Sequence, residues 1–356
     1  MRRVLAGTAV LVGGALLAAG CSSSSSSSSS AAAGGSSAPA ASSSSAAAAP
    51  VTVRLGYLAN ITHAPALIAV KNAYFSKELG SAGSVKTTVF TSGTQETTAI
   101  LAGQLDAAYV GPNPAINAWQ KSGGTAIKVV SGVATGGASV VVKPSITSAA
   151  QLKGKSLATP SLGNTQDVAA RYWLKQQGLA TSTTGGGDVS IKPTAPNSAA
   201  VLEFKSGQIA GASEPSPYDV QMVQAGGKVL LSEPGVTTVL MVTQSFLSAH
   251  PDIVSDLLKA NLDALNFIKS SPAQAEQVSN DQLAAYTGKP LSAKVLDPAF
   301  KEITFTADPD AASLKGDAQQ ATAVGLLKSV SLDGIFDLDP LNSLLTADDQ
   351  STVSAG

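Results

Sequence analysis

Apolar and polar positions alternate along the chain in a way that predicts strands and helices in turn from Val51 onward. Residues 51–58 alternate as a half-buried strand does, and residues 64–79 carry apolar side chains at helical spacing. We therefore expect one strand followed by one continuous helix. Further strands are predicted at 84–90, 106–110, 126–133 and 138–143, with helices at 94–104 and 114–123. This succession is typical of βαβ units and predicts an α/β fold with mostly parallel sheets.

The pattern starts again after residue 148 and predicts a second lobe. Residues 149–232 alternate between short helices and strands, residues 237–243 form a strand that returns to the first lobe, and helices dominate after Ser245. About 300 residues also exceed what one hydrophobic core usually holds. We therefore expect lobe 1 at residues 51–138 and 241–356, and lobe 2 at residues 139–240.

The first 50 residues lack this pattern and have the features of an export signal. Arg2 and Arg3 precede a short apolar run that ends at Cys21, the single cysteine. Small residues before Cys21 resemble a bacterial lipobox, although Ala18 stands where leucine is usual. We expect residues 1–21 to be a lipoprotein signal peptide, with Cys21 lipidated. A plain signal peptide is the alternative.

Residues 22–50 are rich in serine and alanine, a composition that predicts a disordered tether. The protein would then be extracytoplasmic and lipid-anchored to the outer face of the cell membrane.

Composition narrows the possible functions. Lys and Arg number 23 against 24 Asp and Glu, and only 13% of residues are charged, so no basic face for nucleic acid is expected. One cysteine and two histidines are too few for the common metal sites, and no P-loop, HExxH or Gly-x-Ser-x-Gly motif occurs. We expect no cofactor and no metal. His63 is the one candidate catalytic base, and without a positioned acid partner we expect the protein not to be an enzyme.

Four junctions share one order of features, in which a strand ends, small or polar residues follow, and a helix begins. Ser92 and Gln95 have capping-box spacing, and Asn113 is expected to cap a helix whose first residue is Pro114. Free N–H groups at helix starts bind anions without a lysine or arginine, and in parallel sheets they gather at the carboxyl ends of the strands. One junction alone indicates only a cap. The junctions are Asn60–His63, Ser92–Gln95, Asn113–Pro114 and Asn164–Thr165, and in the last either Asn164 or Thr165 is expected to be the cap.

Residues 54–80, 111–124 and 157–179 resemble the aliphatic-sulfonate, nitrate and taurine binding lipoproteins of bacterial ABC importers. The resemblance extends from Val51 to about Leu345. It implies a two-lobed periplasmic-binding-protein-like fold (type II), joined by crossing strands at 138–143 and 237–243. It also implies a monomer that closes around a small anionic ligand and delivers it to a membrane permease. The residues that it places in the cleft are Asn60, His63, Thr94, Gln95, Pro112, Asn113, Gly137, Asn164 and Thr165.

One departure from the family pattern concerns the ligand. Relatives carry a Trp-x-Pro-Glu-Pro-like stretch, whereas this chain has Ser213 at the aromatic position and Glu214 beside the acidic one. Glu214 is expected to offer a carboxylate to the ligand or, alternatively, to be a solvated loop residue. Loss of the aromatic side chain predicts a ligand bulkier than a short alkanesulfonate.

Three hypotheses of function follow from these observations. The first is an importer's receptor for an aliphatic sulfonate, and the second keeps the fold but binds a thiamine-precursor pyrimidine, another vitamin-like heterocycle, nitrate or taurine. The third is an enzyme on this scaffold with His63 as its base. For the receptor we expect His63 to be a donor whose protonated form strengthens anion binding, so that affinity falls as pH rises through its pKa.

Overall fold

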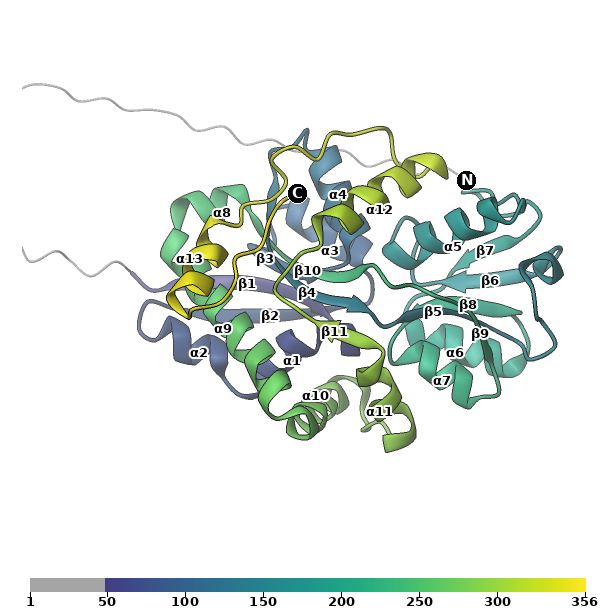
Figure 1. Cartoon of the computed structure of the whole chain (residues 1–356), viewed down its shortest axis with the longest axis horizontal. Helices are drawn as coiled ribbons and strands as arrows, with labels where there is room; N and C mark the ends of the chain where they lie inside the picture. The colour runs from purple at the N-terminus through teal and green to yellow at the C-terminus, as the bar shows by residue number, and fades with distance from the viewer. Residues whose placement is uncertain (1–48) are drawn as a thin grey trace, which may run out of the picture. The chain divides into compact units, whose positions relative to one another are not determined.

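The computed structural model describes residues 49–356, which belong to one compact unit, Ala48–Gly356 (Figure 1). The predicted signal peptide, Cys21 and nearly all of the predicted tether lie outside the described residues. Within residues 49–356, no helix is both long and apolar enough to cross a bilayer. The unit contains two β-sheets with helices on both faces of each, so the α/β prediction is confirmed.

The first sheet has six strands in the order β11-β4-β10-β3-β1-β2. Strand β1 pairs in parallel with β2 and β3, as expected for βαβ units, whereas β10 pairs antiparallel with β3 and β4. Because β1 and β3 are parallel, the helix starts that follow them meet at one edge of the sheet. The strands are β1 (Val51–Leu58), β2 (Gly83–Phe90), β3 (Ala107–Val110), β4 (Ile127–Gly136), β10 (Val236–Thr243) and β11 (Ile303–Phe305).

The second sheet has five strands in the order β7-β6-β8-β5-β9. Strand β6 pairs in parallel with β7 and β8, and β5 pairs antiparallel with β8 and β9. The strands are β5 (Ala138–Val142), β6 (Ser156–Thr159), β7 (Ser190–Pro193), β8 (Gly211–Pro215) and β9 (Lys228–Ser232).

Two short junctions carry the chain between the sheets. Strand β4 passes into β5 through Gly137, and β9 passes into β10 through residues 233–235. Gly136 and Gly137 both have φ values of 70°, which side chains other than glycine rarely adopt. The expected second boundary, between residues 240 and 241, falls inside β10, all of which lies in the first sheet. The return to the first sheet is therefore complete at Val236, close to the start of the returning strand expected at 237–243 and before the expected lobe boundary.

Helices cover both faces of each sheet, and four hydrophobic clusters fill the layers between them. In Figure 1 the helices α1, α2, α9 and α10 lie on one face of the first sheet, and α3, α4 and α12 on the other. The second sheet has α5 on one face and α6 and α7 on the other. The helices are α1 (Ala64–Lys71), α2 (Tyr74–Leu79), α3 (Gly93–Leu101), α4 (Pro112–Lys121), α5 (Thr165–Gln176), α6 (Asn197–Ser206), α7 (Tyr218–Gln224), α8 (Gln244–Ala249), α9 (Pro251–Ser270), α10 (Pro272–Thr287), α11 (Ala293–Lys301), α12 (Ala311–Ala323) and α13 (Asp339–Ala347), with two 3₁₀ helices at Ile61–His63 and Ala149–Leu152.

The single helix expected at residues 64–79 is two helices. Helix α1 ends at Lys71, and Ala73 adopts a left-handed conformation with φ of 57° before α2 begins. The break turns α2 so that Phe75 and Leu79 enter the same core as α1. Tertiary packing therefore prevails over a helical periodicity that runs through the break.

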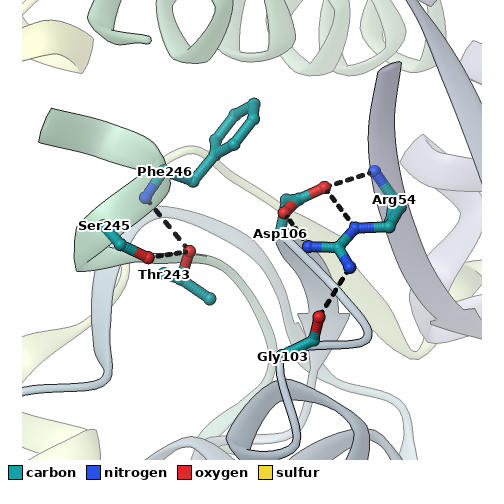
Figure 2. Close-up of polar contacts among 6 residues, drawn as sticks. All are labelled: Arg54, Gly103, Asp106, Thr243, Ser245 and Phe246. Carbon is teal, nitrogen blue, oxygen red and sulfur yellow. Dashed lines mark hydrogen bonds and ion pairs between the residues drawn. The ribbon is translucent and has the colours of Figure 1, made fainter. Parts of the chain in front are cut away.

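A polar cluster ties β1 to the loop before β3 (Figure 2). The Arg54 side chain donates from Nε to Asp106 Oδ2 at 2.9 Å and from Nη1 to the Gly103 carbonyl. Asp106 also accepts the backbone N–H of Arg54 at 2.8 Å. Although burial opposes its ionisation, these hydrogen bonds hold the pKa of Asp106 below its ordinary value. Nearby, Thr243 accepts the Phe246 N–H and caps α8 at the end of β10.

Candidate functional site

Three helices from the two sheet regions begin at one enclosed cavity, which we call the central cavity. Gly93 at the start of α3, Gly111 before α4 and Thr165 at the start of α5 all line it. Asn60 and His63 line it from the segment after β1. The cavity volume is about 20 Å³, which is room for roughly one water-sized group. Free N–H groups and the positive ends of three helices therefore meet in a nearly closed space.

The start of α4 contacts the start of α5 across this cavity. A Cβ atom at Gly111 would lie 2.5 Å from Thr165 Oγ1, so only glycine permits this approach. Thr165 is 5% exposed, and its hydroxyl oxygen has no hydrogen-bond partner in the structure. Gly111 rather than Asn113 is the N-cap residue, and α4 begins at Pro112. Asn113 is buried and donates from Nδ2 to the Asp317 carbonyl at 3.2 Å, which directs that amide nitrogen toward α12.

A buried ion pair fixes the start of α5. Asn164 Oδ1 accepts the Asp167 N–H at 3.0 Å, so Asn164, one of the two expected cap residues, is the N-cap of α5. Asp167 in turn accepts hydrogen bonds from Thr159 Oγ1 and the Gly163 N–H, both at 2.9 Å. Arg171, one turn later, lies 3.0 Å from Asp167, and both side chains are at most 1% exposed. The loop before α5 is therefore held from several sides, which positions the N–H groups that face the cavity.

His63 is neutral in this environment. It is 2% exposed, and its Nδ1 accepts the Leu58 N–H at 3.3 Å. Burial lowers the pKa of His63 to about 3. The prediction that His63 is a protonated donor is therefore wrong near neutral pH. Because Nδ1 is the acceptor, the ring proton lies on Nε2, which is the donor available to a bound molecule. A pKa this low also makes His63 a weak base for catalysis.

The remaining predicted residues of lobe 1 lie around the cavity rather than on its wall. Gln95 is exposed and accepts a hydrogen bond from Thr91 Oγ1 at 3.0 Å, and Ser92 makes no side-chain cap bond, so the capping box does not form. Thr94 Oγ1 donates to Ser161 Oγ at 3.2 Å and thereby connects the two sheet regions. Gly137 accepts the Ser216 N–H at the junction between the sheets.

Glu214 lies inside the second sheet region and is completely buried. Neither of its carboxylate oxygens has a hydrogen-bond partner, and it is not on the wall of the central cavity. Burial, and then the nearby Asp219 and Glu233, raise the pKa of Glu214 well above its ordinary value. The alternative of a solvated loop residue is therefore wrong. Ser213, at the position of the missing aromatic residue, donates to Glu233 Oε1 at 2.6 Å.

Sequence reasoning missed three polar residues of the central cavity. Gln166 is the second residue of α5, Thr62 lies between the predicted Asn60 and His63, and Thr237 is the second residue of the returning strand β10. The position of Gln166 in the first turn of a helix start was a usable signal. Nothing in the local sequence distinguishes Thr237 from the other threonines of β10.

The central cavity offers neutral hydrogen-bond donors. None of the described residues on its wall has a charged side chain. Within residues 49–356, no group of three or more His, Cys, Asp or Glu residues could hold a metal ion. The helix starts, the Thr165 hydroxyl and His63 Nε2–H are therefore complementary to a small anionic group with several acceptor oxygens.

The two sheets, their paired junctions and the helix starts at the shared cavity define the two-lobed fold of periplasmic substrate-binding proteins. The chain belongs to the NMT1-like family, whose model matches residues 46–281. No curated protein sequence matches the chain.

Solved structures with this fold include proteins named for the binding of nitrate and of sulfonates. The nitrate-binding protein NrtA of Synechocystis PCC 6803 is 16% identical, with a TM-score of 0.72 over 84% of this chain and 89% of that one. The alkanesulfonate-binding protein SsuA of Xanthomonas axonopodis pv. citri, bound to MOPS, is 18% identical, with a TM-score of 0.66 over 80% and 96%. SsuA of Escherichia coli, which binds aliphatic sulphonates, is 20% identical, with a TM-score of 0.60 over 77% and 86%. The resemblance expected from sequence is confirmed.

Proposed function

We propose that the protein is the extracytoplasmic substrate-binding component of an ABC importer and captures an aliphatic sulfonate by closure of its two lobes. The observation that carries this proposal is the convergence of the α3, α4 and α5 starts on one cavity that has no charged side chain on its wall. A sulfonate has three acceptor oxygens and one negative charge, which suits neutral donors at the positive ends of helices. The solved relatives named for nitrate and sulfonates share this fold.

Hydrogen bonds between the lobes support closure as the means of capture. Ile61 N–H donates to the Ser216 carbonyl at 2.9 Å, and Tyr218 OH donates to the Ala59 carbonyl at 3.1 Å. These contacts lie beside the central cavity and would have to break for a ligand to enter. The junctions at Gly137 and residues 233–235 are short enough to serve as the hinge of such a motion.

A second candidate ligand is a vitamin-like heterocycle such as a thiamine-precursor pyrimidine. The observation that favours it is Glu214, whose buried carboxyl group has no hydrogen-bond partner and would pair with an amino-substituted ring. It stands second because Glu214 is separated from the cavity wall, so the lobes would have to rearrange to expose it.

Titration calorimetry with the purified protein tests these candidates. The panel contains methanesulfonate, butanesulfonate, taurine, nitrate, sulfate and an aminopyrimidine. We expect heat with the sulfonates and none with the aminopyrimidine. Heat with the aminopyrimidine alone would overturn the sulfonate proposal in favour of the second candidate.

We also propose that Cys21 carries a lipid that holds the protein at the outer face of the membrane, beside its permease. The intact mass of the protein extracted from membranes should correspond to a chain that begins at Cys21 and carries acyl groups. Replacement of Cys21 by serine should release the protein into the medium. A Cys21→Ser protein that stays in the membrane fraction would contradict this anchor.

A further inference from the structure

A second and larger cavity lies beside the central cavity, and we call it the side chamber. Leu58 and Asn60 line both, so the two cavities are neighbours at the end of β1. Its volume is about 380 Å³, against about 20 Å³ for the central cavity. Both lobes enclose it: β2 and α10 form one side, and the starts of α6 and α7 form the other.

The wall of the side chamber is largely apolar. Phe90 and Val89 come from the end of β2, Leu283 and Tyr286 from α10, and Tyr218 from α7. Tyr218 is oriented by its hydrogen bond to the Ala59 carbonyl, which leaves its ring as part of the wall. Such a wall favours an apolar ligand over water, because the free energy falls when apolar surface is removed from water.

The volumes of the two cavities limit the size and shape of the substrate. The central cavity holds only about one water-sized group, so the lobes must open slightly to admit a head group at the helix starts, and the rest of an organic anion has to lie elsewhere. The neighbouring space beside Leu58 and Asn60 is the side chamber. We propose that the side chamber binds the apolar body of the ligand, and that the substrate is an organic sulfonate with a long alkyl or a ring-sized tail, not a small inorganic oxyanion. This inference rests on the proposed function, since it takes the helix starts as the site of the head group.

Two polar side chains of the chamber refine this ligand class. Lys289 is the one charged residue among those described on the wall, and it is exposed, so water screens its charge. Asn197 is 6% exposed, and its Oδ1 has no hydrogen-bond partner in the structure. A tail that carries one hydrogen-bond donor would satisfy this oxygen and gain affinity over a tail of hydrocarbon alone.

Chain length is the first test. Dissociation constants are measured by titration calorimetry for unbranched alkanesulfonates from one to eight carbons, and for benzenesulfonate and naphthalenesulfonate. We expect affinity to rise about threefold to fourfold per methylene group, as expected for transfer of a methylene group out of water, until the chamber is filled. Nitrate and sulfate should bind at least tenfold more weakly than octanesulfonate.

A blocking variant and a matched control give the second test. Ser198 is exposed and lies on the chamber wall in the first turn of α6, whereas Ser206 is exposed at the end of the same helix and outside the chamber. We expect Ser198→Trp to lower the affinity for octanesulfonate to that for methanesulfonate, with methanesulfonate binding unchanged. Ser206→Trp should alter neither. Lys289→Ala should leave methanesulfonate binding unchanged, because the head group lies in the central cavity.

The outcomes separate this inference from the proposal on which it rests. Equal affinities for all chain lengths, with methanesulfonate bound, would overturn the side chamber as a ligand site and leave the receptor function standing. The same is true if Ser198→Trp leaves octanesulfonate binding unchanged while melting and circular dichroism show a folded protein. Absence of heat with every sulfonate in the wild-type protein would overturn the proposed function and this inference together.

Discussion

His63 shows what the sequence can and cannot predict about a single residue. Its rarity and its place before a helix identified it as part of the site, and it does line the central cavity. Its charge state could not be predicted, because the burial that lowers its pKa to about 3 arises only in the folded chain. The local sequence contains no record of that desolvation.

Replacement of His63 by alanine should therefore weaken sulfonate binding without changing its pH dependence. Loss of a hydrogen bond to a charged ligand costs about 1.5–3 kcal/mol, or roughly tenfold to a hundredfold in the dissociation constant. The ratio of the variant and wild-type dissociation constants, measured by calorimetry, should be the same at pH 5 and pH 8. A ratio that falls tenfold toward pH 8 would mean that His63 binds the ligand as a cation.

Thr165 allows a test of one hydroxyl group with little change of shape. Its Oγ1 is buried without a hydrogen-bond partner, so Thr165→Val should keep or raise the melting temperature. Sulfonate affinity should fall about tenfold, since one donor to the head group is lost. Thr98→Val, at an exposed position of α3, is the control and should leave affinity unchanged. Equal affinities of the Thr165→Val and wild-type proteins would remove this hydroxyl from the site.

At the scale of elements, the sequence located most helix starts but not always their first residues. The start of α5 was predicted with Asn164 or Thr165 as its cap, and the structure selects Asn164, whose side chain accepts the Asp167 N–H. The start of α4 was placed two residues late, because Pro112 and Pro114 both suit the first turn of a helix and the pattern does not choose between them. The break at Ala73 was missed, because a left-handed alanine has no sequence signal and is imposed by packing.

The ion pair between Asp167 and Arg171 should be the strongest single polar contribution to the second sheet region. Both side chains are nearly inaccessible, so Asp167→Asn leaves a buried guanidinium without its partner and should cost about 3–5 kcal/mol of the free energy of unfolding. Urea denaturation measures this loss. Asp188→Asn removes the exposed pair with Lys153 and should change stability little. Similar losses in the two variants would contradict the structural role of the buried pair.

At the scale of the whole molecule, a pair of carboxyl groups lies between the lobes. Ser216 Oγ donates to Asp219 Oδ1 at 2.8 Å and lies 3.5 Å from Glu302 Oε2. Burial, followed by the charge of Glu302, raises the pKa of Asp219 to about 7. Burial also raises the pKa of Glu302 and brings that of Glu233 to about 8. Asp219 and Glu233 are therefore neutral in acid and approach ionisation near neutral pH.

The sign of the resulting pH dependence follows from the raised pKa values. An acid whose pKa is higher in the folded protein binds its proton more tightly there, so its stabilisation is complete near pH 4 and is lost as pH rises through about 7. We expect the free energy of unfolding to fall between pH 5 and pH 8, and Asp219→Asn to reduce that slope. Urea denaturation at several pH values measures both. A wild-type stability that rises over this range would contradict the prediction.

The two-lobed fold was predictable from the order of the strands and helices. Their alternation starts again after residue 148, and the strand at 237–243 then brings the chain back to the first lobe. The second lobe boundary was placed inside β10, because this strand is buried along its whole length and its sequence does not mark the short junction at residues 233–235 that precedes it. The side chamber was not predicted at all. Its wall combines β2, α6, α7 and α10, which are far apart in the sequence, so only the folded chain brings them together.

In the proposed receptor, neutral donors at three helix starts bind a negatively charged group. The most direct test compares butanesulfonate with butyl methyl sulfone, which has a similar shape but no charge, by titration calorimetry on the wild-type protein. We expect butanesulfonate to bind at least a hundredfold more tightly than the sulfone. Only butanesulfonate carries a negative charge, which the helix ends stabilise and which strengthens the hydrogen bonds that it accepts. Equal affinity for the two compounds would contradict the anion site.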